Sequence, residues 1–209
     1  MRIIAGSAKG RRLKVPKRES QIRPILSRIR QSMFDSIRPK VMASNFLDLY
    51  AGTGIVGFEA LSRGAQLVVF VDKGRESLKL IEANITLMKC QDKAIVHSGD
   101  VLGGALMLLK ARLEGLDSRF RGNDGSGGIL FDLVFVAPPY LGEDRRGSVL
   151  IMSVPTLQKL KDSRLLAPGA WVVVQHHQKE PWSSLPDGFK IYKKAKFGES
   201  LLTYLEWEK

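Results

Sequence analysis

The chain has 209 residues, of which 44% are hydrophobic, so it can bury the core of one full domain and a small appendage. No run of about 18 apolar residues occurs and the N-terminus lacks a signal-peptide core, so we expect neither membrane insertion nor secretion. The single cysteine, Cys90, cannot form an internal disulfide, and we expect a reduced thiol in a cytoplasmic protein.

The formal net charge of +12 is concentrated at the N-terminus. Residues 1–40 hold twelve basic and two acidic side chains, a net charge of +10, which leaves +2 for the remaining 169 residues. So lopsided a charge favours a polyanionic partner, RNA or DNA, at this end of the chain, with a solvated basic arm as the simpler alternative. We therefore predict a basic RNA-binding region over 1–40 and a main domain over 41–209.

The N-terminal region begins with a predicted hairpin and continues with a predicted helix. Residues 1–15 alternate apolar and basic residues around two glycines, as in a small β-hairpin that must pack on the main domain or become ordered on RNA. The Arg23-Pro24 pair then opens a helix that Pro39 is expected to end, with an apolar stripe spaced by four: Ile25, Ile29, Met33 and Ile37. Arginines off this stripe are expected to point outward, and the candidate RNA-binding residues are Arg11, Arg12, Arg23, Arg28 and Arg30.

Residues 45–57 predict a first strand that turns into a first helix through glycines. Gly52 and Gly54 allow a tight turn whose backbone can lie against a ligand, and Gly57 lets the helix pack close to the strand. Asp48, four positions before Gly52, suits the ammonium and sulfonium of S-adenosylmethionine, whereas it would repel the pyrophosphate of a dinucleotide. The pattern therefore favours the methyl donor over a dinucleotide or a purely structural turn.

Three later strands deliver further candidate ligand contacts at their ends. The apolar strand 67–72 ends in Asp72, where a carboxylate can hold a ribose diol. The strand 94–97 precedes Asp100, which is a candidate acceptor for an adenine amino group, a helix N-cap, or both. The fourth strand, 129–136, ends at the segment 137–140, where two prolines fix an extended backbone and Tyr140 offers a flat face to a base.

The remaining pattern completes an alternation of helices and strands. Helices are expected over 55–62, 76–88, 102–113 and 149–161, and strands over 169–174, 189–196 and 201–207. The glycine-rich segment 114–128 has no periodicity and is predicted to be a surface insertion. Because the neighbours His176 and His177 should point to opposite faces of a strand, we expect no metal site.

These motifs resemble those of class I S-adenosylmethionine methyltransferases in order and spacing. Apart from 114–128, nearly the whole chain further resembles the bacterial 16S ribosomal RNA (guanine(966)-N2)-methyltransferase family. The segments that carry this resemblance are 2–6, 10–13, 23–24, 28–30 with Phe34, 48–54, 58–65 and 197–199. The resemblance implies an α/β, Rossmann-like fold: a seven-stranded, mostly parallel sheet with an antiparallel C-terminal hairpin and a small basic N-terminal extension.

The resemblance also implies an activity, a cofactor and a partner. We expect transfer of a methyl group from S-adenosylmethionine to the exocyclic N2 of a guanine in 16S ribosomal RNA or the assembling 30S subunit, by a monomer. The expected cofactor-binding residues are Asp48, Tyr50, Gly52, Thr53, Gly54, Asp72, Lys73, Asp100 and Val101. The target guanine is expected to enter beside the catalytic segment Ala137, Pro138, Pro139 and Tyr140.

Ala137 departs from the family pattern, in which this segment begins with Asp. A guanine amine is a poor nucleophile, and an acceptor beside it would orient it and stabilise developing positive charge. The Pro138 carbonyl can accept one hydrogen bond, but loss of the second is expected to slow transfer by a factor of about 10² to 10³.

Three functions therefore remain open. The first is an RNA guanine-N2 methyltransferase, impaired by Ala137. The second is an RNA-binding or ribosome assembly factor that keeps the cofactor fold without turnover. The third is a DNA amino-methyltransferase, which uses a similar proline pair, although the short N-terminal region offers no separate target-recognition domain.

Overall fold

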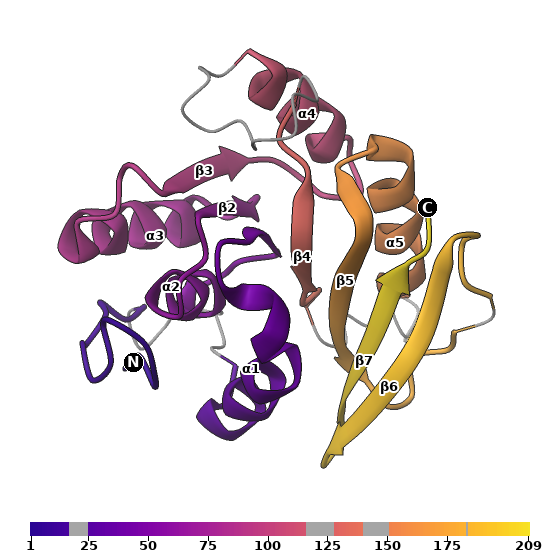
Figure 1. The fold of residues 1–209 in the computed structure, drawn as a ribbon, viewed down its shortest axis with the longest axis horizontal. Coiled ribbons are helices and arrows are strands. Elements are labelled where there is room, and N and C mark those ends of the chain that lie inside the picture. The colour runs from indigo at the N-terminus through magenta and orange to yellow at the C-terminus, as the bar shows by residue number, and fades with distance from the viewer. Residues whose placement is uncertain (17–24, 116–127, 140–150, 183) are drawn as a thin grey trace.

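A computed structural model describes residues 1–16, 25–115, 128–139, 151–182 and 184–209. Within these residues, five helices cover a single sheet of seven strands (Figure 1). The helices are α1 (Ser27–Val41), α2 (Ile55–Ser62), α3 (Arg75–Met88), α4 (Ala105–Glu114) and α5 (Ser153–Ser163). The strands are β1 (Asn45–Leu49), β2 (Leu67–Asp72), β3 (Ala94–Ser98), β4 (Phe131–Val136), β5 (Leu166–His177), β6 (Phe189–Phe197) and β7 (Ser200–Trp207).

The strand order is β3-β2-β1-β4-β5-β7-β6. Strands β1 to β5 are parallel to one another, whereas β7 runs antiparallel to both β5 and β6. The predicted mostly parallel seven-stranded sheet with an antiparallel closing hairpin is thus confirmed. The strand order reverses between β1 and β4, and in open α/β sheets ligands bind beyond the carboxyl ends of the strands at such a point.

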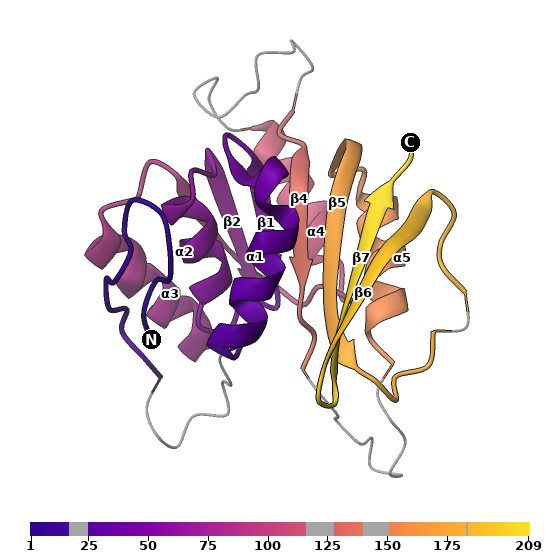
Figure 2. The ribbon, with the colours of Figure 1, turned by 60° about the horizontal axis from the view of Figure 1, so that its bottom comes forward.

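Each face of the sheet buries its own apolar cluster. Helices α1, α2 and α3 cover one face and α4 and α5 cover the other, as Figure 2 shows. Strand β2 is buried along nearly its whole length, which explains its continuous apolar sequence. Within the described ranges, no helix is long and apolar enough to cross a membrane.

The first helix differs from its prediction at both ends. It begins at Ser27, and Arg23 and Pro24 lie outside the described residues. It continues through Pro39 to Val41, because a proline in the last turn removes only one backbone donor, while Val41 gains a buried position. Most of the predicted insertion, residues 116–127, also lies outside the described part of the chain.

The predicted N-terminal hairpin is confirmed and packs on the main sheet assembly. Arg2 pairs with Arg12 in an antiparallel bridge, and the Ile3 N–H donates to the Arg11 carbonyl at 3.0 Å. Ile3 and Leu13 are buried in the cluster beneath α2 and α3. The ribbon thus packs on the domain, which is one of the two alternatives that the sequence leaves open.

A buried glutamate on α2 holds this ribbon in place. The Glu59 carboxylate accepts hydrogen bonds from the Ile4 and Ala5 N–H groups at 2.8 and 2.9 Å. It also forms ion pairs with Arg30 at 3.5 Å and Arg63 at 2.9 Å, and its side chain has no exposed surface. A charge so deeply buried is tolerated because both of its oxygens have partners.

We predict that Glu59→Gln lowers the free energy of unfolding by about 3 to 5 kcal/mol, because it leaves the buried Arg30 guanidinium without its counter-charge. Urea unfolding of the full chain measures this, with Glu82→Gln on the exposed face of α3 as the control, expected to change stability by less than about 0.5 kcal/mol. Equal stability of the two variants would show that the Glu59 ion pairs do not hold the ribbon.

Candidate functional site

The carboxyl ends of β1, β2 and β3 bring the predicted cofactor residues to one edge of the sheet. Leu49 pairs with Val71 and Asp72 with Ser98, so the turn after β1 lies beside the end of β2, which lies beside the end of β3. The turn itself is left-handed at Tyr50, Gly52 and Gly54, with φ of 58°, 53° and 71°. Positive φ is uncommon at a residue as bulky as tyrosine, and no sequence pattern predicts it at Tyr50.

Gly57 allows α2 to pack directly on β2, as predicted. A Cβ at Gly57 would lie 2.3 Å from the Phe70 ring and 2.7 Å from the Val68 side chain. Any larger residue would push α2 away from the sheet and move the turn that precedes it.

The Asp72 carboxylate joins the glycine turn to the end of β2. Its Oδ2 accepts the Gly52 N–H at 2.8 Å, and its Oδ1 accepts the Gly74 N–H at 2.7 Å. Each carboxylate oxygen has a second acceptor site, so the side chain can still accept hydrogen bonds from a ligand's hydroxyl groups. The donor and acceptor set here, backbone turn plus carboxylate, fits the ribose of an adenosyl group.

The sequence predicts that the Asp48 carboxylate faces a cationic ligand at this edge, but in the structure the carboxylate is not exposed there. Its side chain is buried, and its Oδ2 accepts the Gly57 N–H at 3.0 Å. Burial raises the pKa of Asp48 well above its usual range; the Gly57 hydrogen bond opposes this shift, and nearby Asp72 adds to it. An acidic residue at a strand end therefore serves here to fix the start of α2 beneath the turn.

Asp100 and Lys73 form a solvent-exposed ion pair with Nζ and Oδ2 2.9 Å apart. The hydrogen bond from Lys73 lowers the pKa of Asp100 more than burial raises it. The second Asp100 oxygen accepts the Leu102 N–H at 3.1 Å, in a turn that delays the start of α4 until Ala105. The N-cap of α4 is Gly104, so the N-cap alternative for Asp100 is wrong.

Three further residues, Thr53, Val101 and Tyr50, are predicted to bind the cofactor. Thr53 and Val101 are almost fully buried, so neither side chain is open to a ligand at the edge. The Tyr50 hydroxyl lies 2.7 Å from the Thr156 hydroxyl of α5, and burial raises the pKa of Tyr50 to about 12. Tyr50 therefore connects the turn to the helix on the opposite face.

The predicted catalytic segment follows β4, which pairs with β1 at the centre of the sheet. The Ala137 N–H donates to the Leu49 carbonyl at 3.4 Å, which places this segment beside the glycine turn. Pro138 is buried and Pro139 is exposed, while Tyr140 lies outside the described residues. No group of histidine, cysteine or acidic side chains suited to a metal occurs among the residues the structure describes.

The predicted RNA-binding arginines separate into two groups. Arg11, Arg12 and Arg28 are exposed, and Arg23 lies outside the described residues. The expectation that Arg30 points outward is wrong: its side chain is 3% exposed and lies against Glu59. Burial lowers the pKa of Arg30, and its guanidinium donates to the Arg2 carbonyl at 2.8 Å, so it anchors the ribbon.

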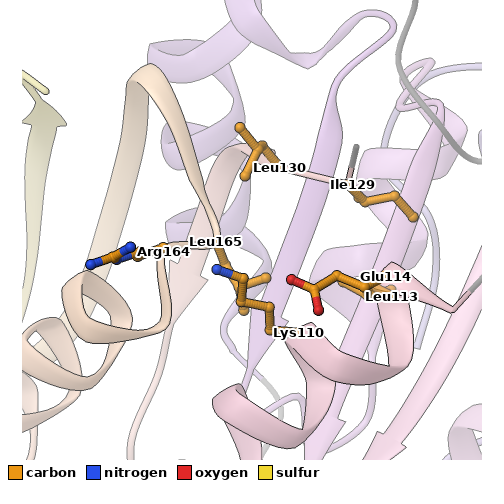
Figure 3. Close-up of a pocket in the computed structure, with 8 residues that line it drawn as sticks. Lys110, Leu113, Glu114, Ile129, Leu130, Arg164 and Leu165 are labelled. Atoms are coloured by element: carbon orange, nitrogen blue, oxygen red, sulfur yellow. The ribbon is translucent and has the colours of Figure 1, made fainter. Parts of the chain in front are cut away.

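A separate pocket lies away from this edge (Figure 3). It is lined by residues at the end of α4 and the beginnings of β4 and β5, including Lys110, Glu114, Ile129, Leu130 and Leu165. Because these are the amino ends of the strands, the pocket does not belong to the candidate cofactor site. Two of its lining residues, Glu114 and Gly128, lie on either side in the sequence of residues 116–127, which the structure does not describe.

Comparisons with known proteins agree with this geometry. The Bacillus subtilis protein named "Putative rRNA methyltransferase YlbH" is 30% identical over 176 residues, 84% of this chain and 82% of that protein. The Escherichia coli "Ribosomal RNA small subunit methyltransferase D" is 26% identical over 199 residues, 95% of this chain and 86% of that protein. The solved structure of "Putative methyltransferase yhhF from Escherichia coli" has a TM-score of 0.76 at 25% identity, covering 100% of this chain and 98% of its own.

The sequence model of one family, described as Conserved hypothetical protein 95, matches residues 1–206. This match covers both the N-terminal ribbon and the sheet, and the fold is that of the Rossmann-like class I methyltransferases. The chain therefore belongs to the Conserved hypothetical protein 95 family of the S-adenosylmethionine-dependent methyltransferase superfamily.

Proposed function

We propose that this protein transfers a methyl group from S-adenosylmethionine to the exocyclic N2 of a guanine in 16S ribosomal RNA. The observation that carries the proposal is the Asp72 carboxylate at the end of β2, which accepts the Gly52 and Gly74 amides and so lies against the turn after β1, the strand at which the order reverses. Family membership and the names of the bacterial relatives support RNA as the methyl acceptor. The exposed Arg11, Arg12 and Arg28 supply positive charge for it.

S-adenosylmethionine, when bound, supplies an electrophilic methyl group on a sulfonium. In the proposal, Asp72 holds its ribose hydroxyls and the 52–54 turn faces its methionine part. Asp100 accepts from the adenine amino group with the oxygen that does not face Lys73. Asp48 acts through its charge from beneath the turn, because its carboxylate already accepts the Gly57 amide.

The acceptor amine would lie beside Ala137 and Pro138, at the end of β4. The buried Pro138 ring fixes the backbone there, so that its carbonyl can accept one amine hydrogen and orient the lone pair toward the methyl group. Ala137 offers no second acceptor. This specific feature favours one other candidate function, an RNA-binding assembly factor with little or no turnover.

Ala137→Asp separates these two functions. Restoring a carboxylate beside the amine is expected to raise the rate of methyl transfer by about 10²- to 10³-fold, because developing positive charge gains a stabilising acceptor. Tritium transfer onto unmethylated 30S particles measures the rate, with cofactor affinity as the control, expected to stay unchanged. Absence of transfer with both proteins would leave only the assembly factor.

Asp72→Asn is expected to weaken S-adenosylmethionine binding by roughly tenfold to a hundredfold, because the ribose hydroxyls lose a charged acceptor. Calorimetric titration measures this against Asp92→Asn, an exposed control that should bind like the parent protein. Thermal unfolding of both variants separates a lost contact from a lost fold. Wild-type affinity in a folded Asp72→Asn variant would contradict the proposed ribose site.

The raised pKa of Asp48 predicts opposite pH dependences for stability and for cofactor binding. A carboxyl whose pKa is higher in the folded state binds its proton more tightly there. The wild type should therefore lose up to about 1.4 kcal/mol of stability per pH unit, relative to Asp48→Asn, from the ordinary Asp value near 4 up to the raised value. Over the same window, wild-type affinity for the cationic donor should rise, by up to about tenfold per unit.

Urea unfolding and calorimetric titration of both proteins across this pH range check the prediction. The Asn variant still offers an oxygen to the Gly57 amide and should show neither slope from this group. Parallel curves for the two proteins would show that Asp48 does not titrate in this way.

A further inference from the structure

The outer strand β6 concentrates the positive charge of the main sheet assembly. It holds four lysines and no acidic residue between Phe189 and Phe197. Residues 41–209 carry a net charge of +2, so without β6 this part of the chain would be net negative, at −2. In Figures 1 and 2 the strand forms the edge of the sheet farthest from the N-terminal ribbon.

One lysine of β6 faces α1 across an open groove. Lys193 lies opposite Tyr204 in the strand register, its Nζ donates to the Ser36 hydroxyl at 2.8 Å, and it lies 5.3 Å from the Tyr204 ring centre. The groove is lined by Arg28, Gln31, Ser32, Asp35, Ser36 and Lys193. The Asp35 carboxylate accepts a hydrogen bond from Gln31. The charged side chains that line the groove are therefore two cations, Arg28 and Lys193, and this one carboxylate.

Two other lysines point to the opposite side of the same strand. Lys194 and Lys196 lie opposite Thr203 and Leu201 of β7, and both are exposed. No ion pair to either occurs within the described residues, whereas Lys190 lies 3.2 Å from Glu208. The strand thus presents unneutralised ammonium groups along its edge as well as into the groove.

The end of β6 lies toward the same end of the sheet as the candidate site. Ser200, at the turn that follows β6, pairs with His177 at the carboxyl end of β5. Lys196, one residue before the end of β6, therefore lies toward the same end of the sheet as the glycine turn and the 137–139 segment, and Lys193 lies three residues farther from that end. Tyr192, 41% exposed between the lysines, adds an aromatic surface of the kind that single-stranded nucleic acids stack on.

Lysines on an edge strand also have a simpler role, since they prevent the strand from pairing with another sheet. That role requires charge only along the edge itself. It does not explain Arg28, which comes from α1 and faces the same groove as Lys193. Nor does it explain why β6 alone reverses the sign of the charge over 41–209.

We propose that Arg28, Lys193, Lys194 and Lys196 form an outer-strand surface that binds the phosphate backbone of the RNA substrate. This inference rests on the proposed function and adds a contact region on the opposite side of the site from the N-terminal ribbon. Arg28 and Lys193 face the groove on one side of the strand, and Lys194 and Lys196 point to the other side, so this surface follows the outer edge of the sheet around both of its faces. RNA phosphates that contact these groups release their condensed counterions.

The salt dependence of RNA binding tests this surface. The affinity falls as salt concentration rises, and each lost phosphate contact on single-stranded RNA reduces the magnitude of the slope of log K against log salt concentration by about 0.7. Lys194→Gln/Lys196→Gln should therefore show a slope smaller by about 1.4 than the wild type, and Lys193→Gln, which keeps a partner for Ser36, a slope smaller by about 0.7. The probe is transcribed, unmethylated 16S ribosomal RNA in filter binding over a series of KCl concentrations.

The matched control is Lys79→Gln/Lys159→Gln, which removes two exposed lysines from α3 and α5 and should keep the wild-type slope. Calorimetric titration with S-adenosylmethionine checks that every variant retains its fold. If β6 variants bind RNA with the wild-type slope, the outer-strand surface is refuted and the lysines only protect the sheet edge. If the wild type binds the cofactor but neither binds nor methylates the RNA, the proposed function itself fails.

Discussion

The conformation of the turn between β1 and α2 depends on the hydrogen bond between the Gly57 amide and the buried Asp48 carboxylate. This hydrogen bond joins β1 to α2 directly beneath the turn that connects them, so the turn has little freedom to relax. The left-handed conformation of Tyr50 can persist only under such constraint, because a bulky residue disfavours it. The conformation of the turn at the candidate cofactor site is therefore fixed by a buried carboxylate.

Helix α2 also connects the cofactor edge to the N-terminal ribbon. Its first turn follows Gly54, and Glu59, on its next turn, accepts the Ile4 and Ala5 amides. A rigid helix of eight residues thus has the glycine turn at one end and the ribbon on its side. In the proposed function, RNA bound to the ribbon and methyl donor bound to the turn would contact two parts of one packed unit.

The sequence predicts the sheet well and the buried polar contacts poorly. Parallel strands such as β2 are apolar on both faces, so their positions are readable as continuous runs that end at an acidic residue. Arg30 was misplaced because the side of α1 that it occupies is covered by a ribbon that only the tertiary structure brings there. Glu59 lies more than 50 positions from the amides that it binds, and no local pattern reports such a contact.

The predicted cofactor residues lie at the expected edge of the sheet, but some of them make contacts within the protein that the sequence does not predict. The end of a parallel strand fixes where an acidic side chain lies, so Asp72 and Asp100 occur at the expected edge. Spacing does not say which way the carboxylate turns, and a backbone amide such as that of Gly57 competes with any ligand for it. Exposure after folding decides between these roles: Asp48 is 1% exposed, whereas the Asp100 side chain is 44% exposed.

In the proposed function, the basic side chains at the two ends of the sheet bind the same RNA. The N-terminal ribbon packs near α2 and α3, and β6 closes the opposite edge, so the carboxyl ends of the central strands lie between two basic regions (Figure 1). Electrostatic attraction to phosphate is not specific for sequence, and one basic region alone would leave an RNA free to pivot. Two regions on either side of the site restrict that rotation. In the proposed function, Ala137 supplies no acceptor to orient the target amine, so placement of the RNA from both sides would be the main means of aligning the guanine with the methyl group.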